Sequence, residues 1–220
     1  MRALEDCYLY GILDTGYCEP GAMPAMLERM AAGGVDIVQL RAKNQPEDRV
    51  EELTRELHPI ARARGIPFIL NDWPAIAGRA GVEGAHVGVE DMTVAEARRL
   101  AGRRCLIGKS SHSLEQAEAG AAQGADYLGF GPLFATPTKP DYHPIGTHDI
   151  QEVHRRLTLP IFCIGGIKLE NLPAVLAAGA RRAVIVSGLL QAPDVTAYAR
   201  TCAGLLRSNG AAGGALAGEQ

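Results

Sequence analysis

The chain has 220 residues, of which 47% are hydrophobic and 21% are charged, and its formal net charge is −3 at pH 7. This composition is typical of a globular domain that buries a large core, and it excludes a chain that is mainly disordered. The lack of a basic excess and the aromatic content of 5% argue against nucleic acid as a partner, which needs cations or stacking surfaces.

Neither a secretion signal nor a membrane span is expected. Glu5 and Asp6 interrupt the N-terminal segment, and no apolar run reaches the length of about 18 residues that a membrane helix needs. The five cysteines are an odd number without a C-x-x-C pair, so we expect buried, reduced thiols in a cytoplasmic protein. No histidine spacing indicates a zinc site.

A pattern recurs along the chain, in which a helix-like stretch ends in glycine and a short apolar run follows. Glycine stops a helix, and short runs rich in Val, Ile and Phe are typical of parallel strands buried on both faces. Residues 24–32, 46–64 and 114–123 have the apolar spacing of amphipathic helices, and Thr93 with Glu96 predicts a capping box. The apolar runs predicted as strands are residues 8–13, 36–40, 67–70, 84–88, 105–108, 126–130, 160–164 and 183–186.

Repeated alternation of strand and helix within this length predicts a single (β/α)8 barrel of the α/β class. An open doubly wound sheet is the alternative, although such sheets more often have about five or six strands. We expect the barrel to occupy residues 1–207 and the Gly- and Ala-rich residues 208–220 to form a flexible C-terminal tail. No helix face indicates an interface, so a homo-oligomer is left open.

In such a barrel the carboxyl ends of the strands form the working face, so the residues that end each apolar run are candidates for a site. Each of them alone is more often a solvated loop residue, and their combination carries the prediction. Alternation places Gln39, Arg41 and Lys43 on one side of the chain after the second run. The other candidates at these ends are Asn71, Asp72, Asp91, Ser110, Thr136, Thr138, Lys139, Gly165, Gly166, Ser187 and Gly188.

These residues suit a phosphate and a divalent cation. Glycines after the last two strands let backbone N–H groups approach a phosphate, or they serve a turn that needs a positive φ. Asp72 and Asp91 suit Mg²⁺ that bridges substrate phosphates, although Asp91 also stands where it suits the N-cap of the next helix. Arg41 and Lys43 suit an anion, or they pair with surface carboxylates.

Several of these strand ends belong to longer motifs. The motifs are QLRAK (39–43), ND (71–72), GAHVGVED (84–91), IGKSSHS (107–113), GADYLGFGPLFATPTK (124–139), PIFCIGGI (160–167) and VIVSGL (184–189). In this order they resemble the thiamine-phosphate synthase family, from about residue 8 to residue 190. The resemblance implies a transferase that joins a pyrimidine diphosphate to a thiazole phosphate, releases diphosphate and requires Mg²⁺ as its cofactor.

The resemblance also implies a role for each candidate. Asp72 and Asp91 would bind Mg²⁺, and Gln39 would contact the pyrimidine. The residues implied to hold the departing diphosphate are Arg41, Lys43, Asn71 and Lys139, with Ser110 nearby. The candidate catalytic residues among them are Arg41, Lys43, Ser110 and Lys139. Those implied to hold the thiazole phosphate are Thr136, Thr138, Gly166 and the backbone of Val186 and Ser187.

Some residues depart from the family or are given no role. Trp73 and Val89 differ from the residues that the family usually has, and Trp73 is interpreted as a packing residue. His86 lies within a predicted strand and is interpreted as a core histidine, while Asp14 is assigned no role.

Two alternative functions are kept beside the synthase, both with small-molecule ligands. In a thiazole tautomerase of the TenI type, an acid–base histidine follows the Phe-Gly of the sixth strand, where this chain has Pro132. A non-catalytic phosphate-binding barrel that senses thiamine precursors would be expected to lose a metal carboxylate or a diphosphate cation, and this chain retains the whole set. Both observations favour the synthase.

Overall fold

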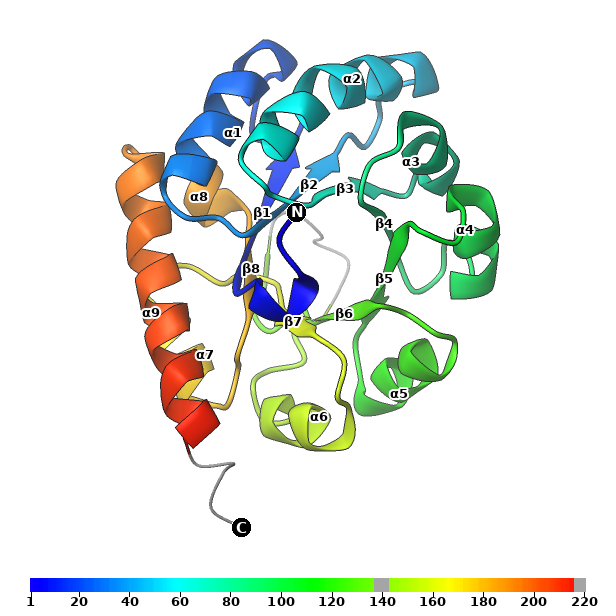
Figure 1. Cartoon of the computed structure of the whole chain (residues 1–220). Coiled ribbons are helices and arrows are strands. Elements are labelled where there is room, and N and C mark those ends of the chain that lie inside the picture. The colour runs from blue at the N-terminus through cyan, green and yellow to red at the C-terminus, as the bar shows by residue number, and fades with distance from the viewer. Residues whose placement is uncertain (137–142, 216–220) are drawn as a thin grey trace.

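The computed structural model describes residues 1–136 and 143–215, with the backbone alone for 211–215. Eight parallel strands pair in chain order, and the last pairs with the first to close a barrel (Figure 1). This confirms the predicted (β/α)8 fold and excludes the open sheet. The strands are β1 Leu9–Asp14, β2 Ile37–Arg41, β3 Phe68–Asn71, β4 Gly84–Val87, β5 Leu106–Ser111, β6 Tyr127–Phe130, β7 Ile161–Cys163 and β8 Ala183–Ile185.

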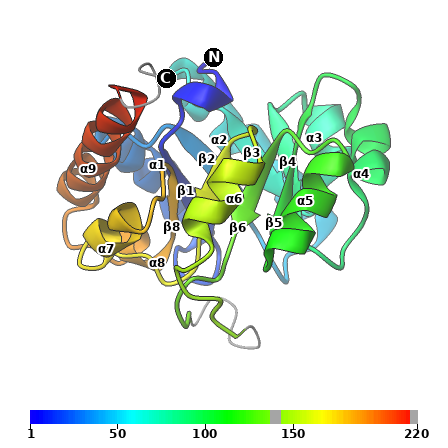
Figure 2. The same cartoon turned by 90° about the horizontal axis from the view of Figure 1, so that it is seen from below.

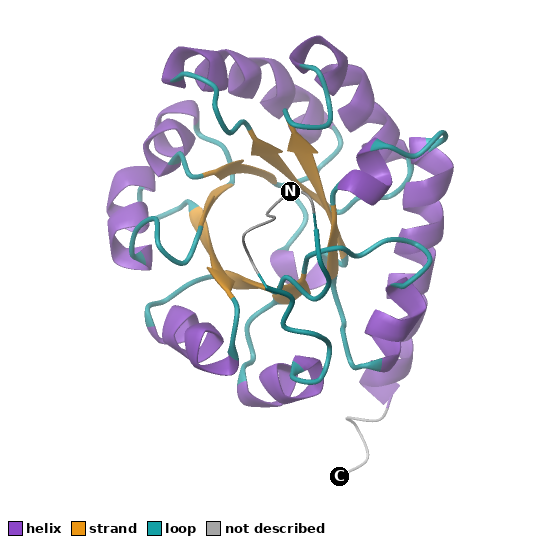
Figure 3. Ribbon diagram, turned by 180° about the vertical axis from the view of Figure 1, so that it is seen from behind, coloured by secondary structure: helices purple, strands orange, loops and turns teal. Residues whose placement is uncertain are grey.

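Helices surround the barrel on its outside (Figure 3). The three predicted amphipathic helices are present, and α4 begins at the predicted capping box, where Thr93 and Glu96 exchange side chain to backbone hydrogen bonds. The helices of the described residues are α1 Met23–Ala32, α2 Glu47–Ala63, α3 Pro74–Ala80, α4 Val94–Ala101, α5 Leu114–Ala122, α6 Ile150–Arg156, α7 Leu172–Ala177, α8 Ser187–Leu190 and α9 Val195–Ala215, with the short 3₁₀ turns η1 Leu4–Asp6 and η2 Pro20–Ala22.

The core has an outer part between the strands and the helices, and an inner part inside the barrel. In the inner part the rings of Tyr10, Tyr127 and Phe162 pack edge to face, with centroid distances of 5.3, 5.7 and 6.0 Å. Such pairs are a favoured arrangement of aromatic rings. They form a packed floor across the barrel, and space for a ligand lies on one side of it, toward the carboxyl ends of the strands.

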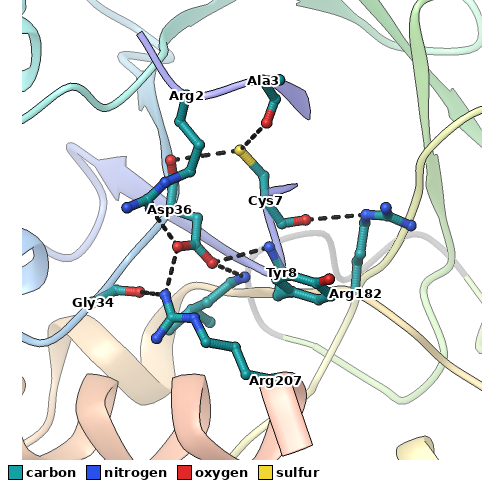
Figure 4. A network of polar contacts seen from close by, with 9 residues as sticks. Arg2, Ala3, Cys7, Tyr8, Gly34, Asp36, Arg182 and Arg207 are labelled. Atoms are coloured by element: carbon teal, nitrogen blue, oxygen red, sulfur yellow. Dashed lines mark hydrogen bonds and ion pairs between the residues drawn. The ribbon is translucent and has the colours of Figure 1, made fainter. Parts of the chain in front are cut away.

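At the opposite end of the barrel a buried carboxylate ties the N-terminal segment and α9 to the sheet (Figure 4). Asp36 is 1% exposed. Its Oδ1 pairs with Arg2 and, at 2.6 Å, with Arg207 of α9. Its Oδ2 accepts hydrogen bonds from the backbone N–H groups of Tyr8 (2.9 Å) and Leu9 (3.0 Å). Asp36 therefore joins the N-terminal segment, β1 and α9 at one point.

Replacement of Asp36 by alanine is expected to lower the free energy of unfolding by about 3 kcal/mol or more, because it leaves buried donors and two guanidinium groups without their acceptor. Urea denaturation followed by circular dichroism measures this change. The matched control is Glu28→Ala, which removes an exposed ion pair to Arg64 and is expected to change stability by less than about 1 kcal/mol. Equal effects of the two variants would contradict the role of Asp36.

The structure differs from the prediction at the C-terminus, where α9 continues through Ala215, so that residues 208–215 are helical. The prediction ended the barrel domain at residue 207 because the glycines and alanines that follow do not indicate, in the sequence alone, that this segment packs on the barrel. Asn209 Nδ2 donates to the carbonyl of Ala180 (3.1 Å). A Cβ built on Gly210 would lie 2.8 Å from the ring of Tyr8. These contacts extend a helix that already packs on the barrel.

All five cysteines are buried and free, as predicted. Burial raises the pKa of Cys105 to about 11 and that of Cys163 to about 12, so these thiols stay protonated and serve as packing groups. Among the described residues, no helix combines the length and the apolar character that crossing a bilayer needs.

Candidate active site

A cavity opens at the mouth formed by the carboxyl ends of the strands. Its lining is mainly apolar and includes a small number of polar side chains, as is usual for sites that hold small molecules. The chain that follows β6 extends from this end of the barrel, opposite η1 (Figure 2). The predicted site residues that line the cavity are Gln39, Arg41, Asn71, Ser110, Thr136, Gly166, Val186 and Ser187.

The predicted metal ligands, Asp72 and Asp91, and the predicted diphosphate ligand Lys43 lie beside this cavity. Lys43 and Asp72 line a smaller cleft together with Asn71, which also lines the main cavity, so the two spaces adjoin. Asp91 interacts with the side chain of Asp72. The structure therefore brings these predicted residues to one mouth. Two further predicted site residues fall outside the described part of the chain: Thr138 and Lys139.

A chain of hydrogen bonds crosses the floor of the cavity. Gln39 Nε2 donates to the Tyr10 hydroxyl (2.8 Å), which lies 3.0 Å from the Tyr127 hydroxyl. The Tyr127 hydroxyl lies 3.2 Å from His86 Nδ1, and His86 Nε2 lies 2.9 Å from Ser110 Oγ. His86 is thus paired on both nitrogens, as expected of a core histidine, and it also lines the cavity. This series of hydrogen bonds fixes the side chains of Gln39 and Ser110 at the surface of the cavity.

Arg41 is held in place by a carboxylate that the sequence analysis left without a role. Its Nη1 donates to Asp14 Oδ2 (2.7 Å), and Asp14 Oδ1 accepts from the backbone N–H of Gly16 (2.8 Å). Asp14 is 1% exposed, so the alternative in which Arg41 pairs with a surface carboxylate is wrong. A guanidinium has five N–H donors, and the pairing with Asp14 leaves others for an anion in the cavity.

Lys43 pairs with Asp72, which is one of the predicted metal ligands. Burial raises the pKa of the Asp72 carboxyl and the neighbouring Asp91 raises it further, while Lys43 opposes the rise. Asp72 has a φ of 66°, unusual for a residue other than glycine. Its backbone N–H donates to the carbonyl of His86 (2.9 Å), which fixes this conformation. Two carboxylates and an ammonium group therefore meet at one point.

Asp91 does not cap the following helix, so this alternative of the sequence analysis is wrong. The N-cap of α4 is Thr93, whose side chain accepts from the backbone of Glu96. Asp91 Oδ2 instead accepts from the backbone N–H of Gly88 (2.7 Å). Thr93 satisfies the helix end, so the Asp91 carboxylate stays within the loop after β4, next to Asp72.

Gly165 and Gly166 follow β7 with φ values of 97° and 67°. A Cβ on Gly165 would lie 2.4 Å from Pro132 Cα, and one on Gly166 would lie 2.7 Å from Phe134 Cβ. The turn that needs a positive φ is therefore confirmed, and it lets the loop after β6 pack against the end of β7. Both glycines also line the cavity, so contact between their backbone and a phosphate stays a prediction.

Comparisons with known proteins show the family to which the chain belongs. The sequence model of the family described as thiamine monophosphate synthase matches residues 9–189. The chain belongs to this family. A thiamine-phosphate synthase of Chloroflexus aurantiacus is 40% identical over 198 residues, which cover 90% of this chain and 91% of that protein. One of Thermus thermophilus is 44% identical over 175 residues, which cover 79% and 84%.

The fold of this thiamine monophosphate synthase family member is also similar to a solved structure. Thiamine phosphate pyrophosphorylase from Pyrococcus furiosus superimposes with a TM-score of 0.85 at 28% sequence identity, covering 94% of this chain and 98% of that chain. The similarity spans the whole barrel and includes the strands that carry the site.

Sequence reasoning missed parts of the site in this family member. Asp14 ends β1 on the same side of the strand as Tyr10, a period-two signal that could have placed both inside the barrel. Lys109 was read as part of a motif and given no role. Trp73, interpreted as a packing residue, is half-buried against the outer core, which confirms that interpretation.

Proposed function

We propose that this family member joins 4-amino-2-methyl-5-hydroxymethylpyrimidine diphosphate to a thiazole phosphate, giving thiamine phosphate and diphosphate. The observation that carries the proposal is the meeting of Arg41, Lys43, Asp72 and Asp91 at the mouth of one cavity. A departing diphosphate needs positive charge, and a divalent cation needs carboxylate oxygens. A mainly apolar cavity with a few polar groups suits small-molecule substrates, and we place the reaction in the cytoplasm.

The reaction breaks the C–O bond between the pyrimidine methylene carbon and the diphosphate, which leaves with the bonding electron pair. The pyrimidine stabilises the resulting cation, and the thiazole nitrogen supplies an electron pair to form the new C–N bond. No strong base is required, because no proton has to be removed to form this bond. The chain has to neutralise the leaving group and hold the two rings in line.

Arg41 and Asn71 line the cavity and would contact the diphosphate, with Lys43 in the adjoining cleft. Asp14 holds the guanidinium of Arg41, so its positive charge is already oriented before substrate binds. Such preorganised charge lowers a barrier because little rearrangement is needed as the leaving group departs. Gln39 would contact the pyrimidine, and Ser110, which is joined to it through the cavity floor, would lie near the diphosphate.

The residues present fit Mg²⁺. Asp72 and Asp91 face each other, and the pKa of Asp72 is raised in part by its neighbour, so a cation between them relieves their repulsion. The described residues hold no group of three or more histidine, cysteine or acidic side chains that could bind a metal, so substrate phosphates would have to complete the coordination of Mg²⁺. When bound, Mg²⁺ neutralises charge on the diphosphate. Lys43, which pairs with Asp72 in the ligand-free chain, would then be available to the same anion.

At the other side of the cavity, Gly166, Thr136 and Ser187 are assigned to the phosphate of the thiazole substrate. All three line the cavity. Asn171 Nδ2 donates to the carbonyl of Gly166 (2.9 Å) and so fixes the turn. Thr138 and Lys139 are proposed to complete the two anion sites, as the family resemblance implies.

The test of the proposal mixes the two substrates with the purified protein, with and without Mg²⁺, and measures diphosphate and thiamine phosphate together. Equal amounts of both products, formed only when both substrates and Mg²⁺ are present, are expected. Conversion of the thiazole substrate alone would indicate a tautomerase. Binding of either substrate without any product would indicate a sensor. Either result would overturn the proposal.

Replacement of Tyr127 by phenylalanine is expected to lower kcat/KM for the pyrimidine diphosphate about 10-fold, the effect of losing one to two net hydrogen bonds. The change keeps the ring in the core but removes the hydroxyl between Tyr10 and His86. Steady-state kinetics measure it. In the control, Tyr198→Phe, the hydroxyl that is lost accepts a hydrogen bond from the backbone N–H of Leu169. An equal loss in both variants would contradict a specific role for the chain of hydrogen bonds.

A further inference from the structure

Lys109 of β5 is a buried lysine that the proposed reaction does not use. Its neighbour Ser110 lines the cavity, so alternation along the strand directs Lys109 outward, into the layer between the strands and helices α4 and α5. Lys109 is only 6% exposed. A Cβ built on Gly120 of α5 would lie 3.5 Å from Lys109 Cγ. The helix therefore passes directly over the aliphatic part of this side chain.

The ammonium group of Lys109 is surrounded by carbonyl oxygens from one loop. Nζ donates to the carbonyls of Gly88 (2.7 Å), Val89 (3.2 Å) and Met92 (2.8 Å). An ammonium group has three N–H donors and this loop supplies three acceptors, which is the condition under which a buried lysine can stay charged. Burial lowers the pKa of Lys109, and the carboxylate of Asp91 opposes that shift.

The same loop, residues 88–92 between β4 and α4, carries Asp91. The carboxylate of Asp91 accepts from the backbone N–H of Gly88 (2.7 Å), and the carbonyl of Gly88 accepts from Lys109. Without the ammonium group, three carbonyls of this half-buried loop would lose their shared donor, and the bonds that hold the loop in this conformation would be gone. Because the Asp91 carboxylate is bonded to that backbone, its position would change with the loop.

We propose that Lys109 is a positioning residue for the metal site, whose ammonium group holds residues 88–92 in the conformation that presents Asp91 to a divalent cation beside Asp72. The inference rests on the proposed function, which assigns both carboxylates to Mg²⁺. Lys109 acts through the loop backbone and touches neither substrate nor metal. Groups that orient metal ligands in this way typically contribute about 10–100-fold to metal affinity.

Arg98 offers a matched control for a purely structural role. It is also a cation that donates to backbone carbonyls, those of Cys105 (3.2 Å) and Gly124 (2.8 Å), and it pairs with Asp126. These acceptors lie just before β5 and β6, at the end of the barrel opposite the mouth. Arg98→Met therefore removes similar bonds in the same sector of the barrel without reaching the loop that carries Asp91.

The experiment titrates Mn²⁺ into the substrate-free protein and follows free Mn²⁺ by electron paramagnetic resonance. Lys109→Met is expected to raise the dissociation constant for Mn²⁺ about 10–100-fold, whereas Arg98→Met leaves it within about twofold of the unaltered protein. Asp91→Asn, the positive control, is expected to lose the tight site. Amide hydrogen exchange of residues 88–93 is expected to quicken in Lys109→Met and to stay unchanged in Arg98→Met.

Unaltered Mn²⁺ affinity in Lys109→Met, with loss of the site in Asp91→Asn, would overturn the role of Lys109 and leave the metal assignment standing. Unaltered affinity in Asp91→Asn would overturn the metal assignment and, with it, the role of Lys109. Equal weakening of Mn²⁺ binding in Lys109→Met and Arg98→Met would also overturn the role of Lys109, because the effect would then be a general one on the fold. If circular dichroism shows that Lys109→Met does not fold, Lys109→Gln is titrated under the same criteria.

Discussion

Replacement of Arg41 by alanine is expected to lower the turnover number at least about 10²-fold, the effect of losing one preorganised donor to developing negative charge. The guanidinium lines the cavity and is already held by Asp14. Water that fills the vacated space cannot supply a fixed positive charge to the diphosphate. Release of diphosphate under saturating substrates measures the change. Arg41→Lys is expected to recover only part of the rate, because lysine lacks the planar fork that matches a phosphate.

The control for this prediction separates lost charge from a damaged fold. Arg41→Ala leaves Asp14 buried without its cation, which destabilises a protein by several kcal/mol in comparable cases, about 3–5. The double variant with Asp14→Ala removes that stranded charge and is expected to remain as slow as the single variant. Arg79→Ala, which alters an exposed ion pair on α3, is expected to stay within about twofold of normal turnover. Near-normal turnover in Arg41→Ala would reject the assigned role.

The double change Asp72→Asn and Asp91→Asn is expected to abolish the Mg²⁺ dependence of the reaction together with its activity, a loss of at least about 10³-fold. Asparagine keeps the shape of each side chain but removes the charge that holds a hard cation. Lys43 would also lose its ion-pair partner at Asp72. Initial rates over a range of Mg²⁺ concentrations measure the effect, and each single variant is expected to need more Mg²⁺ for half-maximal rate.

Asp48→Asn is the control for this pair, because Asp48 is an exposed carboxylate at the start of α2. Its Mg²⁺ dependence is expected to match that of the unaltered protein. Circular dichroism has to show that the double variant is folded. A folded double variant that keeps an unchanged Mg²⁺ dependence would place the metal elsewhere and remove these carboxylates from the mechanism.

The barrel could be predicted because its signals are local. Most helix-like stretches end in glycine, and each strand is an apolar run that is short because it is buried on both faces. The predicted strands therefore overlap β1 to β8 along the whole chain. The candidate site residues at the strand ends could be predicted from the same information, because parallel strands bring their carboxyl ends to one mouth. Gln39, Arg41 and Ser110 accordingly line the cavity.

The alternatives at single residues needed the structure. Sequence spacing alone let Asp91 serve either as a helix cap or as a ligand, and Thr93 occupies the cap. Sequence spacing also allowed Arg41 to pair with a surface carboxylate, whereas in the structure its partner is the buried Asp14. The helical residues 208–215 were predicted as a tail because their composition favours no structure until α9 docks on the barrel.

Local pattern decides which side of a strand a residue faces, where a helix stops and which loops meet at one mouth, because these depend on neighbours in the chain. Tertiary structure decides which side chains pair. Tyr10 and Tyr127 are 117 residues apart, Asp14 and Arg41 are 27 apart, and Lys109 is 21 residues from Gly88. Their contacts follow from the stagger of strands around a closed barrel, which is a property of the whole sheet and of no single segment.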